Sequence, residues 1–186
     1  MWNRTAVAVT SLGVALFVAC MPDEQRAEDA RDALKQALER ADRGAALAAI
    51  DELQEALQDS PESLLEIAQL RIVAGDAPRA SWLLEEAVRR FPKRDDLRLA
   101  LARVALLLGN PSLAHEVLAP VAPDSERHAD ALVTRAQAEL NLGDLERALE
   151  TLADAERLYP DWPEARLVRI ATLLSEQRRD EARVAI

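Results

Sequence analysis

Residues of one kind recur along this chain at a fixed spacing of 34. Three of its five glycines are separated by that interval, and so are five alanines: Gly75, Gly109 and Gly143, then Ala46, Ala80, Ala114, Ala148 and Ala182. A constant period of this length marks helix–turn–helix units that bury their apolar faces against neighbouring units. The period therefore predicts an all-α repeat architecture, of the kind that presents surfaces to other macromolecules.

The period divides the chain into five units. With Ala148 at position 20, they cover residues 27–60, 61–94, 95–128, 129–162 and 163–186, and the fifth is incomplete. Positions 8 and 12 are apolar and lie one turn apart, so they share a face of the first helix of each unit. Positions 20, 24 and 27 do the same on the second helix. Alanine at position 20 is expected to let the two helices approach closely.

The turn between the helices has its own chemistry. Glycine at position 15 supplies a left-handed residue that ends the first helix, at the three positions we call the period glycines (Gly75, Gly109 and Gly143). The next residue, Asp76, Asn110 or Asp144, is expected to cap the second helix. The first and fifth units depart from this pattern, because Ala41 and Gln177 replace the glycine.

This pattern resembles the tetratricopeptide repeat (TPR) over about residues 27–186, most clearly in the second to fourth units. The residues that carry the resemblance are Gly143-Asp144-Leu145-x-x-Ala148, then Leu152, Ala155 and Pro160. It implies a right-handed α-solenoid of about four full units plus a partial fifth, with first helices that line a concave groove. Arg71 and Glu139, both at position 11, mark the repeats as divergent.

The N-terminal segment predicts export. Arg4 precedes an apolar stretch, residues 5–19, which is shorter than the roughly 20 residues of a membrane-spanning helix. Such a stretch suits the core of a secretory signal peptide. It ends at Cys20, the only cysteine, and so resembles a bacterial lipoprotein signal, although Phe17 stands where leucine is usual. We expect a signal peptide at 1–19, a lipidated Cys20 with a short tether at 20–26, and the repeat domain at 27–186.

Two alternatives remain open for this segment. An ordinary signal peptide or a short anchor with a chance cysteine would also fit the residues. If Cys20 is lipidated, the protein is tethered by acyl chains and faces the periplasm of a diderm bacterium. Met21 after the cysteine resembles the sorting pattern for the outer membrane. The inner membrane stays the alternative.

Composition excludes some functions. The formal net charge of −10 argues against nucleic-acid binding, because phosphate backbones require clustered Lys and Arg. The period glycines lack the GK[ST] ending of a phosphate-binding loop. His115 and His128 are 13 residues apart without a cysteine partner, and His115 is expected to face solvent. We therefore predict no metal, no cofactor and no catalytic residues, and a protein that is not an enzyme.

The resemblance also indicates where a partner would bind. Positions 2, 5, 9, 12 and 13 of TPR first helices are the chief groove positions. Among residues at positions 5, 9 and 13 of the second to fourth units, we predict a partner groove lined by Leu65, Gln69, Val73, Leu99, Arg103, Leu107, Val133 and Gln137. The apolar residues at position 5 fit either ordinary core or an apolar strip that holds a partner helix or extended peptide. Arg103 and Gln137 are candidates to orient a peptide backbone or a carboxylate. Position 2 is acidic in every unit, which the helix dipole explains.

The sequence supports two further predictions about surfaces. Trp82, on the second helix of its unit, fits either packing on the convex face or an exposed contact, and we expect packing. An exposed apolar end is expected where the fifth unit stops, formed by Leu167, Ile170, Leu174 and Ile186.

The function that these features favour is a lipid-anchored scaffold or adaptor in the cell envelope that binds a protein or peptide. The design resembles that of lipoproteins in pilus, secretion and outer-membrane assembly systems, and this resemblance implies a role in one of them. The alternative is an accessory subunit that holds substrate for an enzyme system such as cytochrome c maturation. Neither the partner nor the oligomeric state follows from the sequence.

Overall fold

A computed structural model describes residues 23–184 of the chain. Within that range the fold is all-helical, with ten helices and no strand. The predicted signal peptide, Cys20 and Ile186 lie outside the described residues. The chain divides into two compact units, residues 1–76 and 77–186.

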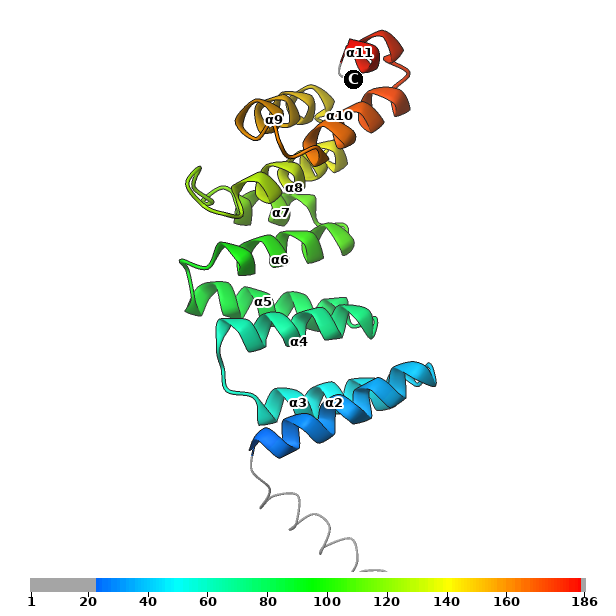
Figure 1. The fold of residues 1–186 in the computed structure, drawn as a ribbon, viewed down its shortest axis with the longest axis vertical. Helices are drawn as coiled ribbons and strands as arrows, with labels where there is room; N and C mark the ends of the chain where they lie inside the picture. The colour runs from blue at the N-terminus through cyan, green and yellow to red at the C-terminus, as the bar shows by residue number, and fades with distance from the viewer. Residues whose placement is uncertain (1–22, 185–186) are drawn as a thin grey trace, which may run out of the picture. The chain divides into compact units, whose positions relative to one another are not determined.

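The first unit contains α2 (Asp23–Glu39), α3 (Arg43–Ala56) and α4 (Pro61–Val73). Figure 1 shows α2 and α3 as a closely packed pair, which is the first repeat. Both helices have buried alanines. Helix α2 begins at Asp23, so residues 23–26, assigned to the tether on sequence grounds, form its first turn. Helix α4 begins after Ser60, with Pro61 at the first helical position, where its missing N–H costs nothing.

The second unit contains α5 (Ala77–Arg90), α6 (Asp95–Leu107), α7 (Pro111–Leu118), α8 (His128–Asn141), α9 (Leu145–Leu158), α10 (Glu164–Ser175) and α11 (Arg179–Val184). Helices that follow one another in the chain contact one another, and α8 also contacts both α6 and α10. Figure 1 shows α8 and α10, the first helices of two successive repeats, next to each other. The predicted all-α stack of helix pairs is confirmed.

The repeat positions predicted to form the core are buried. All five alanines at position 20 are buried, and so are Leu84, Leu118 and Leu152 at position 24. Helix α7 is the shortest of the full repeats at eight residues. It ends at Leu118 because Pro120 cannot donate a helical hydrogen bond and restricts the residue before it. Val121 nevertheless stays buried just beyond the helix end.

All five turns between paired helices have the same geometry. The period glycines have φ of 79°, 73° and 83°, and Ala41 and Gln177 match them at 54° and 60°. In each turn the following residue donates its N–H to the carbonyl five residues earlier, at 2.7 to 2.9 Å, which closes a Schellman cap. The side chains of Asn110 and Asp144 accept from the backbone N–H three residues on, so these two predicted caps are confirmed.

Candidate functional site

The first helices of the second unit, α6, α8 and α10, carry five of the eight residues predicted to line a groove. Leu99 on α6 and Val133 on α8 are only 4% and 3% exposed, so their side chains contribute to the core of this unit. Leu107, at the end of α6, is 63% exposed. Arg103 and Gln137 are exposed as well. The exposed surface is therefore more polar than an apolar strip would be.

Three predicted residues meet at one cavity. Arg103 from α6 and Val133 and Gln137 from α8 line a hollow of about 320 Å³. Three residues that were not predicted for the site complete it: Asp130 and Thr134 from α8, and Glu164 from α10. Asp130, Val133, Thr134 and Gln137 follow the helical spacing of three and four, so they share one face of α8.

The Arg103 guanidinium is already paired. Its Nη2 donates to Asp130 Oδ1 at 2.9 Å, which joins α6 to α8. Thr134 Oγ1 donates to the Asp130 carbonyl at 2.8 Å and is thereby satisfied in its buried position. Within residues 23–184, no hydrogen bond or ion pair engages the side chains of Gln137 or Glu164, and both residues are exposed. The cavity thus combines one internal ion pair with two polar groups that are available.

The remaining three predicted residues lie on α4, in the first unit. Leu65 is half-buried, whereas Gln69 and Val73 are exposed. Val73 borders a second cavity of about 360 Å³, which Leu38, several alanines and Gly75 also line. Arg43 closes one wall of it by donating from Nε to the Ala74 carbonyl at 3.1 Å and from Nη2 to the Gly75 carbonyl at 2.9 Å.

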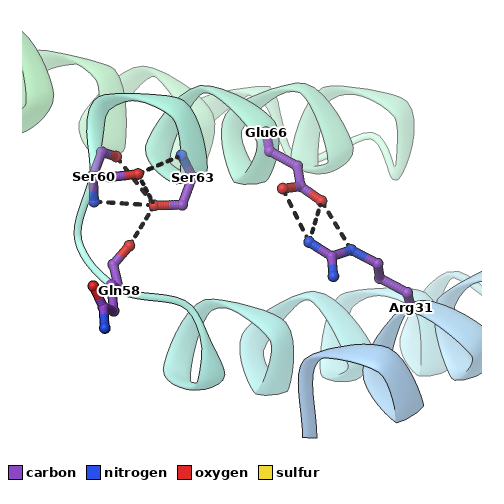
Figure 2. Close-up of polar contacts among 5 residues, drawn as sticks. All are labelled: Arg31, Gln58, Ser60, Ser63 and Glu66. Carbon is purple, nitrogen blue, oxygen red and sulfur yellow. Dashed lines mark hydrogen bonds and ion pairs between the residues drawn. The ribbon is translucent and has the colours of Figure 1, made fainter. Parts of the chain in front are cut away.

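An ion pair between first helices recurs in the first unit. Arg31 on α2 donates through Nε and Nη2 to the Glu66 carboxylate on α4, at 3.0 to 3.2 Å (Figure 2). The same figure shows how α4 starts: Ser60 and Ser63 form a reciprocal capping box, and Ser63 Oγ also donates to the Gln58 carbonyl. Arg31 stands at a groove position by sequence, but its charge is engaged within the protein.

The two unusual residues at position 11 are buried charges. Arg71 Nη2 donates to Asp51 Oδ1 at 2.6 Å and to Gln54 Oε1 at 2.9 Å, and its side chain is 7% exposed. Glu139, at 2%, accepts from Thr151 Oγ1 at 2.8 Å and lies 3.2 Å from Arg147 Nε. Each links the first helix of its repeat to a neighbouring second helix, α3 for Arg71 and α9 for Glu139.

Two expectations outside the groove were wrong. His115 does not simply face solvent, because its Nε2 is buried and lies 3.6 Å from Glu139 Oε1. Trp82 does not pack against the repeat, because 64% of its surface is exposed. In both cases the sequence identifies the helix correctly. It does not predict the rotation of the helix about its axis, which decides whether a side chain is buried or exposed. Of the predicted apolar end, Leu167 and Leu174 are exposed and Ile170 is half-buried.

His128 lies at the start of α8, and its surroundings alter its pKa. Burial lowers its pKa below the ordinary value of 6.5, and the positive charge of Arg135 lowers it further. Its Nδ1 lies 2.7 Å from the Tyr159 hydroxyl, and the two rings are tilted at 59° with centroids 5.9 Å apart. This pair joins the start of α8 to the end of α9 and serves the packing of that repeat.

The described residues show neither a metal cluster nor a membrane-spanning helix. Between residues 23 and 184, no three His, Cys, Asp or Glu side chains are grouped so as to hold a metal ion. No helix in this part of the chain combines the length and the apolar character that crossing a membrane requires.

The comparisons with known proteins agree with the geometry. Family models described as the tetratricopeptide repeat match residues 71–140 and 129–173. No match was found among curated protein sequences. The solved structure of MamA from Desulfovibrio magneticus RS-1 is similar, with 20% identity, a TM-score of 0.64, and coverage of 86% of this chain and 90% of that chain.

A thermophilic TPR protein of Thermus thermophilus, TTC0263, is similar at 22% identity and a TM-score of 0.64, with 86% of this chain and 87% of that chain covered. At these identities the likeness concerns the fold. The two family matches together extend from residue 71 to residue 173, more than half of the sequence. The chain therefore contains tetratricopeptide repeats, which the family models recognise between residues 71 and 173.

Proposed function

We propose that this protein is a lipid-anchored scaffold of the cell envelope that binds a protein partner on the exposed face of α6, α8 and α10. Tetratricopeptide-repeat proteins are typically protein-interaction scaffolds. The observation that carries the proposal for this chain is the cavity of about 320 Å³, where Gln137 and Glu164 lie exposed beside the Arg103–Asp130 pair. Polar groups that are free and gathered at one place suit recognition of a partner.

The anchoring part of the proposal rests on the sequence. Cys20 is the only cysteine, and it follows an apolar stretch of signal-peptide length. Acyl chains on that residue would hold the protein at a membrane, with the outer membrane as the expected site. Two acyl chains or more give stable attachment, whereas a single chain gives only marginal binding.

The binding face is tested by crosslinking in native membranes. Tagged wild-type protein is compared with a Gln137→Arg/Glu164→Arg double variant, whose substitutions are both on exposed residues and preserve the core. A Trp82→Ser variant, on α5, is the matched control for another exposed surface. The proposal expects a partner that is crosslinked by wild type and by the control and is lost from the double variant. Loss from the control alone would move the interface to α5.

The anchor is tested separately. Wild-type cells labelled with radioactive palmitate should yield a labelled protein that partitions with membranes. A Cys20→Ser variant should be unlabelled and released from the membrane fraction. Unlabelled wild-type protein would refute lipidation and leave the binding face unaffected.

A further inference from the structure

The free groups of the cavity between α6, α8 and α10 share one property. The Glu164 carboxylate is an acceptor without a partner, and the Gln137 amide offers an oxygen acceptor beside it. Asp130 has a second carboxylate oxygen, Oδ2, besides the Oδ1 that accepts from Arg103. The acceptors thus come from two helices and surround one space, so the group that satisfies them is a hydrogen-bond donor.

The charged side chains that line the cavity also favour a hydrogen-bond donor, and one with a positive charge. The cavity contains one cationic side chain and two carboxylates, and the cation is committed to Asp130. An incoming carboxylate would share the Arg103 guanidinium with Asp130 and would lie beside the carboxylates of Asp130 and Glu164. Like charges at such short range repel, so the cavity disfavours the carboxylate ligand that Arg103 suggested by sequence alone.

The lining of the cavity is mostly polar. Val133 and Thr134 are its buried members, whereas Gln137 and Glu164 are exposed. The charged head of a lysine or arginine side chain can lie among such polar groups while its aliphatic stem stays with the partner. A bare metal ion fits less well, since the residues described around the cavity include no group of three ligating side chains.

We propose that this cavity receives the ammonium or guanidinium group of a lysine or arginine side chain of the protein partner. The inference rests on the proposed binding function of the same face. The whole chain favours such a ligand as well, because 33 acidic residues against 23 basic ones attract a basic partner at long range. The partner's side chain would bridge Glu164 on α10 and Asp130 on α8.

The test is a titration of the full-length protein, labelled with ¹⁵N in detergent micelles, with short capped peptides. The probes are acetyl-Ala-Arg-Ala-amide, its lysine and glutamate counterparts, and a citrulline peptide, which keeps the shape of arginine without the charge. The readout is the chemical shift of the Gln137 side-chain amide and of the backbone amides around Glu164. Glu164→Gln removes the rim charge, and Glu176→Gln, at the other end of α10, is the matched control.

The proposal expects saturable shifts with the arginine or lysine peptide and none with glutamate or citrulline. Glu164→Gln should weaken the affinity about fivefold or more, since it removes one charge-assisted contact, and Glu176→Gln should leave it unchanged. Added salt should also weaken binding. Shifts with the glutamate peptide, or no response of Gln137 to the basic peptides, would overturn the inference.

These outcomes separate the inference from the proposed function. If the crosslinked partner is lost from the Gln137→Arg/Glu164→Arg variant but the basic peptides give no shifts, the binding face stands and the assigned chemistry fails. If the peptides bind but no partner depends on the face, the cavity is real and the scaffold function fails.

Discussion

Ala41 and Gln177 occupy the same position of the first and fifth repeats, and both adopt a left-handed backbone conformation, with φ of 54° and 60°. The three repeats between them have glycine there. The turn geometry is therefore a property of the packed helix pair, which imposes it on residues that do not favour it. An L-residue in this conformation costs roughly 1 to 2 kcal/mol, so both positions store strain.

Replacing Ala41 by glycine should relieve that strain. We expect Ala41→Gly to raise the free energy of unfolding by roughly 0.5 to 1 kcal/mol, because relief of the left-handed conformation exceeds the added entropy of the unfolded chain. Urea denaturation followed by circular dichroism measures the change. Ala48→Gly, the same substitution at an exposed site inside α3, should lower stability by about 1 kcal/mol. Equal signs for the two variants would show that Ala41 is unstrained.

The buried Arg71 should matter far more than an exposed arginine. Arg71→Ala removes a buried side chain and its charge-assisted bonds to Asp51 and Gln54, and we expect a loss of about 2 to 3 kcal/mol. Arg157→Ala breaks an exposed pair with Asp154 and should cost less than about 0.5 kcal/mol. Arg71→Met fills the same space without charge and should recover most of the loss. Similar costs for Arg71→Ala and Arg157→Ala in urea unfolding would contradict the burial of Arg71.

The stability of the protein should fall as pH drops below the ordinary range of histidine titration, and His128 should account for part of the fall. Burial, then Arg135, lower the pKa of His128 in the folded state, so the unfolded state binds the proton first. Its contribution is complete above about pH 6.5 and is lost progressively as pH falls through the folded-state pKa. Unfolding midpoints in urea at pH 7.5 and 5.5 should differ less for His128→Gln than for wild type. Parallel curves would rule out this contribution.

Arg178 should hold the short helix α11 in place. Its Nε and Nη2 donate to Glu181, and its Nη1 donates to Glu146 at the start of α9. A six-residue helix is marginal without such contacts. Arg178→Ala should therefore speed amide hydrogen exchange in residues 179–184 and leave α6 and α8 unchanged. Arg183→Ala, which breaks an exposed pair with Asp180, is the control and should change exchange little.

The helices and their caps were predictable because they depend on local chemistry that repeats. Position 20 has alanine in every unit, and Asn110 and Asp144 follow a glycine, so these units contain their own turn signals. Ala41 and Gln177 are the instructive exceptions. Alanine and glutamine do not favour the left-handed conformation, yet the packing of the helices on either side imposes it on the backbone. Their turn could be inferred from the period but not from the residues.

The candidate site was predictable only in part, because it depends on pairs between repeats. The period places Arg103 and Gln137 on the exposed face, and the structure brings both to one cavity. The period does not reveal that Asp130 forms an ion pair with Arg103, because the helix dipole alone already accounts for an acidic residue at position 2. Likewise Val133 has the same sequence position whether it faces a partner or the core. The rotation of each helix about its axis decides whether a residue such as Val133 is buried or exposed, and the repeat pattern does not fix that rotation.

The buried charges at position 11 bear on how such a chain finds its own order. Similar repeats can stack on the wrong neighbour, since each offers nearly the same apolar face. Arg71 finds its aspartate and glutamine on α3, and Glu139 finds its threonine and arginine on α9. A chain in which the second repeat stacked on another neighbour would take Arg71 away from Asp51 and Gln54, whereas Glu139 would keep its partners because they belong to its own repeat. A buried charge that loses its partner is strongly destabilising, so Arg71 penalises a wrong order of repeats.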